Sequence, residues 1–92
     1  MAASTCTSVN ASVESVGYGP PVKRSVLIAG HPTSISLEPI FWRALEVAAR
    51  TSGMPLNALV AEIDAARLEV QSPPNLTSAI RQWLFAGAVD RE

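Results

Sequence analysis

Residues 32–45, PTSISLEPIFWRAL, change their pattern of hydrophobic and polar positions halfway along. In the first half, Thr33, Ile35 and Leu37 alternate with serine or proline, and this period of two predicts a strand with one buried face. From Pro39 onward the apolar residues recur every three or four positions, as on one side of a helix. We therefore expect a short strand that leads directly into a helix.

Three helices are expected to follow this strand. The first begins near Pro39, whose fixed φ suits a first turn, and ends at Gly53, which suits a left-handed cap. The second covers MPLNALVAEIDAAR and is stopped by the prolines of QSPPN, residues 71–75. The third, LTSAIRQWLFAGA, is capped by Asn75.

Each predicted helix carries one apolar stripe that is expected to face the core. In the first helix this stripe is Phe41, Leu45 and Ala48, with Trp42 and Ala49 at its flank. The expected inward positions of the second and third helices are Leu56, Leu59, Val60 and Ile63, then Leu76, Ala79, Ile80, Trp83 and Leu84. The charged positions Glu62, Asp64 and Arg67 are expected to face outward.

Residues 24–29, RSVLIA, form a second candidate strand. They either pair with residues 33–37 as a hairpin across the three-residue loop GHP or pack separately as an arm, and the sequence leaves both arrangements open. In both, one edge keeps unpaired backbone groups, and a folded part of about 70 residues is near the size at which oligomerisation completes a core. We therefore expect the strand at residues 33–37 to pair with its copy across a two-fold axis in a homodimer.

The composition describes one globular domain of 92 residues, with 48% hydrophobic and 16% charged positions. We expect residues 1–21 to be a flexible tail, residues 22–88 to form the domain and residues 89–92 to be a C-terminal tail. The single cysteine, Cys6, has no partner for an internal disulfide. Since we find neither a signal peptide nor an apolar run of roughly 18 residues, we expect a cytoplasmic protein without a membrane segment.

The residues that catalysis or metal binding requires do not occur together in the sequence. His31 is the only histidine, and a lone histidine supplies neither a metal-ligand set nor a catalytic triad. Glu62 and Asp64 are two positions apart on a predicted helix and point to different sides. No glycine-rich phosphate loop or nucleophile motif is present. We expect no enzyme activity, no metal and no cofactor.

The positive charge of the chain lies around the predicted strands. The net charge is −1, yet residues 22–37 contain Lys23 and Arg24 and no acid. The strand face opposite the core carries Ser34 and Ser36. A two-stranded ribbon fits the major groove of DNA, about 12 Å wide, where hydroxyl groups can contact base edges and basic side chains can contact phosphates.

Taken together, the motifs KRSV, GH, TSISLE, FW, AL, AEIDAAR and NLTSAIR make the chain resemble the small bacterial ribbon-helix-helix proteins over residues 23–85. The resemblance implies an obligate homodimer, mostly α with a short β-ribbon, here with an additional C-terminal helix. It also implies that the ribbon enters the major groove of double-stranded DNA and that amides at the start of the second helix bind a phosphate.

The resemblance also assigns roles to individual residues. The implied DNA-binding residues are Lys23, Arg24, His31, Thr33, Ser34 and Ser36. The implied phosphate clamp is Leu56 and Asn57, and the implied dimer core is Ile35, Leu37, Phe41, Leu45, Leu59 and Ile63. Two positions depart from the family pattern, since Pro32 replaces a basic residue and Pro55 replaces a serine or threonine cap. A shift of the ribbon by one residue exchanges Thr33 with Ser34 as the reader.

These observations lead us to expect a transcriptional regulator, acting as a repressor that occludes a promoter. The alternative is a ribbon-helix-helix interaction protein or antitoxin that binds a protein partner with its C-terminal helix. Trp83, Leu84 and Phe85 favour this alternative, because three large apolar residues in a row exceed what one helical stripe buries.

Overall fold

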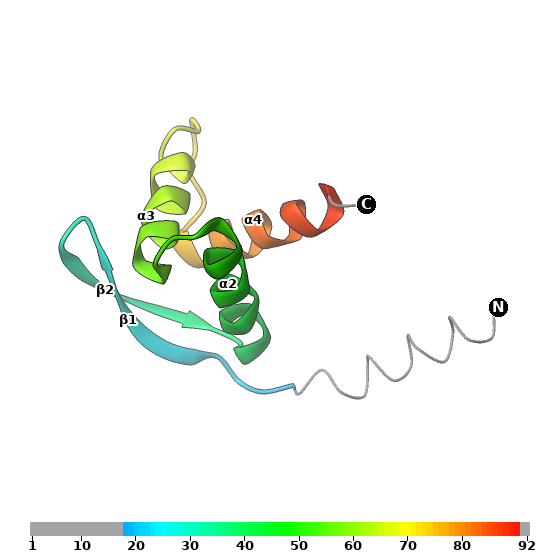
Figure 1. The fold of residues 1–92 in the computed structure, drawn as a ribbon. Helices are drawn as coiled ribbons and strands as arrows, with labels where there is room; N and C mark the ends of the chain where they lie inside the picture. The colour runs from blue at the N-terminus through cyan, green and yellow to red at the C-terminus, as the bar shows by residue number, and fades with distance from the viewer. Residues whose placement is uncertain (1–17, 91–92) are drawn as a thin grey trace.

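The structure is a computed structural model, and it describes residues 18–90 as a two-stranded ribbon packed against three helices (Figure 1). The elements are β1 (Val22–Ile28), β2 (His31–Leu37), α2 (Pro39–Ser52), α3 (Leu56–Arg67) and α4 (Leu76–Asp90). This confirms the predicted ribbon followed by two helices and an additional C-terminal helix. Of the tails expected at residues 1–21 and 89–92, residues 1–17, with Cys6, and residues 91–92 lie outside the described residues, whereas residues 89–90 belong to α4 and not to a tail.

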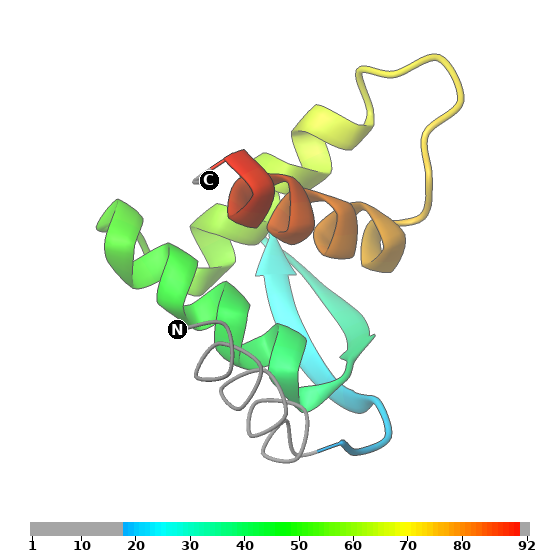
Figure 2. The same ribbon diagram turned by 90° about the vertical axis from the view of Figure 1, so that its right-hand side faces the viewer.

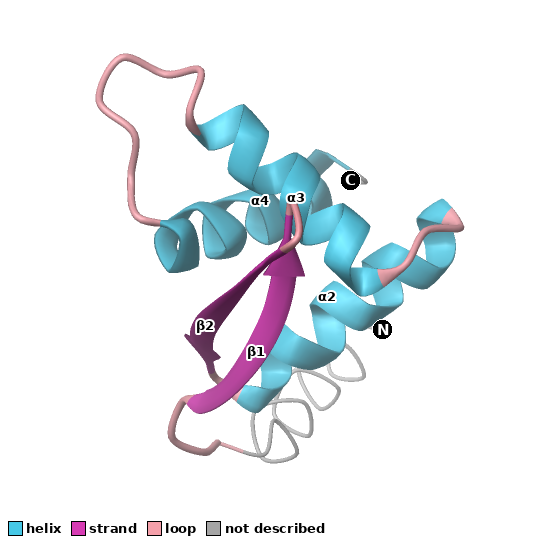
Figure 3. Cartoon of the chain, turned by 90° about the vertical axis from the view of Figure 1, so that its left-hand side faces the viewer, coloured by secondary structure: helices cyan, strands magenta, loops and turns pink. Residues whose placement is uncertain are grey.

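β1 and β2 pair antiparallel with each other within one chain, as Figure 3 shows. Of the two arrangements left open for residues 24–29, the hairpin is therefore the correct one. The loop, however, is Ala29–Gly30 and not the expected three residues. Pro32 already belongs to β2, and the pair Ile28–His31 closes the ribbon next to the loop.

The two loop residues make a turn that fits the twist of the strands. Ala29 has φ 52° and Gly30 has φ 81°. Positive φ at both central positions is the signature of a type I′ turn, the two-residue turn whose twist matches that of a hairpin. Ala29 carries a Cβ in this left-handed region, which costs about 1 kcal/mol.

Replacing Ala29 with Asn should stabilise the domain by up to about 1 kcal/mol, because Asn tolerates the left-handed region better. Gly30→Ala should destabilise it by about the same amount. No atom lies within 4 Å of a Cβ built at Gly30, so that effect would come from the backbone alone. Urea unfolding measures both variants. Equal midpoints for the two variants would contradict the turn assignment.

All three helices lie to one side of the ribbon (Figures 2 and 3). The ribbon side chains that face them are Val26, Ile35 and Leu37, which are buried in the core. Since side chains alternate between the two faces of a strand, the opposite face of both strands is left to solvent.

The buried stripe of α2 is rotated relative to the sequence-based expectation. Trp42, Leu45 and Ala49 are buried, whereas Phe41 and Ala48 are only partly buried against the core. The reason is β1. The indole Nε1 of Trp42 donates a hydrogen bond of 2.9 Å to the backbone oxygen of Val22, which holds the ring beneath the ribbon.

α3 and α4 complete the core largely as expected. Their buried residues are Leu59, Val60, Ile63, Ala79 and Ile80, while Leu56, Leu76 and Leu84 pack partly buried around them. Trp83 differs, because 40% of it stays exposed. Arg67 also differs: its Nε lies 2.7 Å from Asp64 Oδ1, and its Nη1 donates to the backbone oxygen of Pro74, so it braces the loop to α4.

The helix ends follow the local signals in the sequence. Gly53, with φ 70°, follows α2, where its N–H donates to Arg50 O and the N–H of Met54 donates to Ala49 O. These two bonds form a Schellman cap. At α4, the Ser78 N–H donates to Asn75 Oδ1 over 2.8 Å, which confirms the predicted cap. α3 ends at Arg67, before the prolines expected to stop it.

A carboxylate ties α4 to the start of α2. Arg81 Nη2 lies 3.0 Å from Glu38 Oε1, and its guanidinium lies over the ring of Phe41. The pKa of Glu38 is lowered from its ordinary value of 4.5, first by a hydrogen bond from its own backbone amide and then by the bond from Arg81.

Because the folded pKa of Glu38 is lower than the unfolded one, its contribution to stability is present above about pH 4.5 and is lost as the pH falls through the folded pKa. Glu38→Gln should therefore lose less stability than the wild type when the pH is lowered below 4.5. Urea unfolding between pH 7 and pH 3 measures this difference. Parallel pH profiles for the two proteins would contradict it.

Candidate nucleic-acid interface

The pairing of β1 with β2 determines which side chains share the solvent face of the ribbon. Residues directly opposite each other in a ladder point to the same face. The pairs on the solvent face are Lys23–Ser36, Ser25–Ser34 and Leu27–Pro32. Five of these six residues are exposed, and Ser36 is partly buried. We call this set the outward face of the ribbon.

The direction of the Leu27 amide shows that the Cα atoms of the outward pairs are closely spaced. The N–H of Leu27 donates to Asn57 Oδ1 over 3.3 Å, so it points away from β2, and its partner Pro32 has no N–H. The Leu27–Pro32 pair is thus not hydrogen-bonded, and the same holds for every second pair along the ladder. Such pairs have Cα atoms about 4.5 Å apart. The outward side chains therefore form one narrow band.

This band carries hydrogen-bonding groups that the rest of the domain does not use. It presents the hydroxyls of Ser25, Ser34 and Ser36 and the ammonium of Lys23, with no acid. Among residues 18–90, none of these four side chains forms a hydrogen bond or ion pair. The hydroxyls can both donate and accept, and all four side chains are open to an external partner.

Of the six residues implied as DNA-binding, the structure places three on the outward face and three on the other face. Lys23, Ser34 and Ser36 are outward. Arg24, His31 and Thr33 share the face of Val26 and Ile35. Thr33 is partly buried, and its hydroxyl donates to the backbone oxygen of His31 over 3.4 Å. His31 is exposed beside the turn.

Arg24 is held against α2. Its Nη1 lies 3.1 Å from Glu46 Oε2, and its guanidinium lies 4.4 Å from the centre of the Trp42 ring. These contacts make Arg24 a brace between the ribbon and the helix. Sequence reasoning missed Ser25 as an outward residue, because its position opposite Ser34 follows only from the hairpin pairing.

The two implied clamp residues lie at the start of α3, beside the ribbon. Pro55 is the residue before the helix, and no side chain caps the first turn. The amides of Leu56 and Asn57 are among those that have no acceptor inside the helix. The Asn57 side chain is bonded to Leu27, which fixes the start of α3 next to the turn end of the ribbon. A positive helix end therefore adjoins the outward face.

A metal site or a membrane-spanning helix would point to a function other than nucleic-acid binding. Within the described part of the chain, no three His, Cys, Asp or Glu side chains are grouped so that they could hold a metal ion. No helix there is both long enough and apolar enough to cross a membrane.

A profile of the ribbon-helix-helix domain matches residues 21–87, which is well over half of the chain. The chain belongs to the ribbon-helix-helix family. Proteins of this family generally bind DNA, as transcription regulators or antitoxins, and they dimerise. Similarity searches among curated proteins and among solved structures gave no match.

The placement of the two neighbouring basic residues predicts different effects. Arg24→Ala should destabilise the domain by up to about 1 kcal/mol, because it removes a half-exposed ion pair and the stacking on Trp42. Lys23→Ala should leave stability within about 0.5 kcal/mol of wild type. Urea unfolding of both variants measures this. A larger loss for Lys23→Ala than for Arg24→Ala would contradict the assigned faces.

Proposed function

We propose that this protein is a sequence-specific DNA-binding transcriptional regulator that acts as a homodimer. The observation that carries the proposal is the outward face of the ribbon, a narrow band of serine hydroxyls and one lysine. Among residues 18–90, no other side chain forms a hydrogen bond or ion pair with these groups. Family membership supports the DNA-binding role.

In this proposal the hairpin lies in the major groove with its outward face toward the bases. A two-stranded ribbon fits that groove, and serine can contact any base edge as donor or acceptor. Ser25 and Ser34 lie at the middle of the ribbon, so they would reach furthest into the groove. Lys23, near the open end of the hairpin, would contact a phosphate.

The start of α3 would add a second phosphate contact. Free amides at Leu56 and Asn57, together with the positive end of the helix dipole, favour an anion. Because Pro55 supplies no N–H, this contact would be weaker than at a helix with a serine or threonine cap. The protein would act in the cytoplasm without chemistry, as a repressor that blocks a promoter.

Selection from a random duplex library by the purified protein tests this function. We expect a recovered motif with two related halves, because two identical ribbons would read it. The selection should be run at low salt, where phosphate contacts are strongest. Recovery of no sequence above background under these conditions would overturn the proposal.

Two substitutions on the outward face separate the recognition of bases from the electrostatic attraction to phosphates. Ser34→Ala should change the preferred sequence. Lys23→Ala should weaken binding to all sequences and lower the salt slope by about one for each phosphate that the lysine neutralises. Binding titrations at several salt concentrations, against the selected site and a scrambled one, measure both effects. An unchanged preference in Ser34→Ala would remove that residue from the readout.

A second candidate is an antitoxin, which would combine DNA binding with a protein partner on α4. It is favoured by Phe85, which is 71% exposed, and by Val89 one turn further along the helix. The candidate predicts an adjacent gene for a small toxin-like protein. Co-purification of that product with the wild type, and its loss in Phe85→Glu, would support the antitoxin role. Retention by Phe85→Glu would argue against it.

A further inference from the structure

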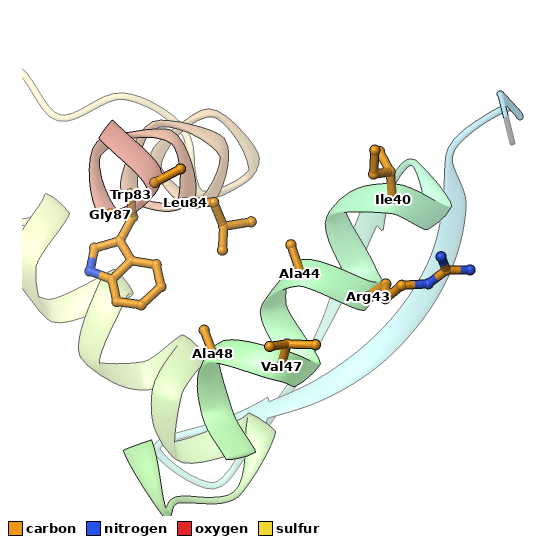
Figure 4. A pocket seen from close by; sticks show the side chains of 9 residues that line it. Ile40, Arg43, Ala44, Val47, Ala48, Trp83, Leu84 and Gly87 are labelled. Carbon is orange, nitrogen blue, oxygen red and sulfur yellow. The ribbon is translucent and has the colours of Figure 1, made fainter. Parts of the chain in front are cut away.

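Exposed apolar side chains occur on both sides of the ribbon. On the helical side, a groove of about 340 Å³ lies between α2 and α4, with Val47 on one wall and Trp83 on the other (Figure 4). On the outward face, Leu27 is 51% exposed, and Pro32 opposite it is also exposed. This second apolar surface lies beside the hydroxyls that contact bases in the proposed function.

The polarity of the outward face changes along the ribbon. From the open end to the turn, its pairs are Lys23–Ser36, Ser25–Ser34 and Leu27–Pro32. Residues 26–30, VLIAG, contain no polar side chain. The outward face therefore ends beside the turn in an apolar pair, whose side chains can neither donate nor accept a hydrogen bond. We call Leu27 and Pro32 the turn-end patch.

The two residues of the turn-end patch form one surface that is held in place. Their pair is not hydrogen-bonded, so the Cα atoms are about 4.5 Å apart and the side chains are close neighbours. The Leu27 N–H donates to Asn57 Oδ1 over 3.3 Å, at the start of α3. The backbone beneath the patch is therefore fixed to the helix that would bind a phosphate.

The major groove of DNA offers an apolar group that suits such a patch. Every base pair presents hydrogen-bond donors or acceptors there, and thymine also presents the methyl group at C5. An apolar patch over the edge of guanine, adenine or cytosine would remove water from polar groups without replacing their hydrogen bonds, which weakens binding. Over the methyl group of thymine it buries apolar surface instead, which strengthens binding.

We propose that Leu27, together with Pro32, makes the protein selective for thymine by packing on the C5-methyl group of that base. The proposal rests on the proposed function, in which the outward face enters the major groove, and it adds the identity of one base. Successive outward pairs are about 7 Å apart along a strand, and successive nucleotides rise about 3.4 Å. The thymine should therefore lie about one or two base pairs from the base that Ser34 contacts, on the side of the turn.

Binding titrations of the full chain against the duplex recovered by selection test this contact. Each thymine in turn is replaced with deoxyuridine, which lacks the methyl group but keeps every hydrogen-bonding group. At the thymine beside the turn, this should raise the dissociation constant about fourfold in one half-site and about 15-fold in both, as expected for one or two buried methyl groups. At the same position, 5-methylcytosine should bind better than cytosine by a similar factor.

Leu27→Ala identifies the side chain that contacts the methyl group. The variant keeps the backbone N–H that bonds Asn57. Its ratio of dissociation constants for uracil and thymine at this position should fall toward one, whereas a loss of stability alone would weaken binding to both duplexes equally. Leu68→Ala is the matched control, because Leu68 is 57% exposed but lies after α3, outside the outward face. Circular dichroism checks folding, and Leu27→Ser replaces Leu27→Ala if that variant is unfolded.

The outcomes separate this contact from the proposed function. A methyl effect that is present in the wild type and in Leu68→Ala, but lost in Leu27→Ala, would support the contact. A selected motif without thymine at this position, a ratio near one in the wild type, or a ratio kept in Leu27→Ala would overturn it and leave sequence-specific DNA binding intact. Selection of no sequence by the wild type would overturn both.

Discussion

The pairing of β1 with β2 inside one chain is the constraint on which the rest of the molecule depends. The turn at Ala29–Gly30 sets the register, and the register determines which side chains of each strand face the helices. Val26 and Ile35 complete the core because Ser25 and Ser34 face the other way. A slip of one residue between the strands would exchange the two faces, so stability and the chemistry of the outward face are specified together.

Three contacts hold the ribbon in a fixed orientation on the helices. Trp42 bonds the backbone at the open end, Arg24 stacks on Trp42 and pairs with Glu46, and Asn57 bonds Leu27 near the turn end. Each uses a polar group of β1 that does not point into the outward face. The ribbon is therefore anchored from behind, and its hydroxyls stay available to a partner. In this account α2 and α3 position the reading surface.

Much of this fold could be predicted because the signals are local. Pro39, Gly53 and Asn75 set helix ends through the backbone of their own neighbourhood, and the change from period two to helical spacing located the strand-to-helix junction. Features that depend on contacts between elements were not predictable in the same way. Phe41 and Trp42 are adjacent and fit the stripe about equally well, and the carbonyl of Val22 decides in favour of Trp42. Likewise, the inward direction of Arg24 and the outward direction of Ser25 follow only from their partners in β2.

The measurement that tests the central claim most directly is isotope-filtered NMR on a mixture of ¹³C-labelled and unlabelled protein. Such a spectrum detects only contacts between different chains. If the ribbon is closed within each chain, the cross-strand contact of Val26 with Thr33 will appear in the unfiltered spectrum and be absent from the filtered one. Appearance of the Val26–Thr33 contact in the filtered spectrum would show that β1 pairs with β2 of another copy, and it would contradict the account.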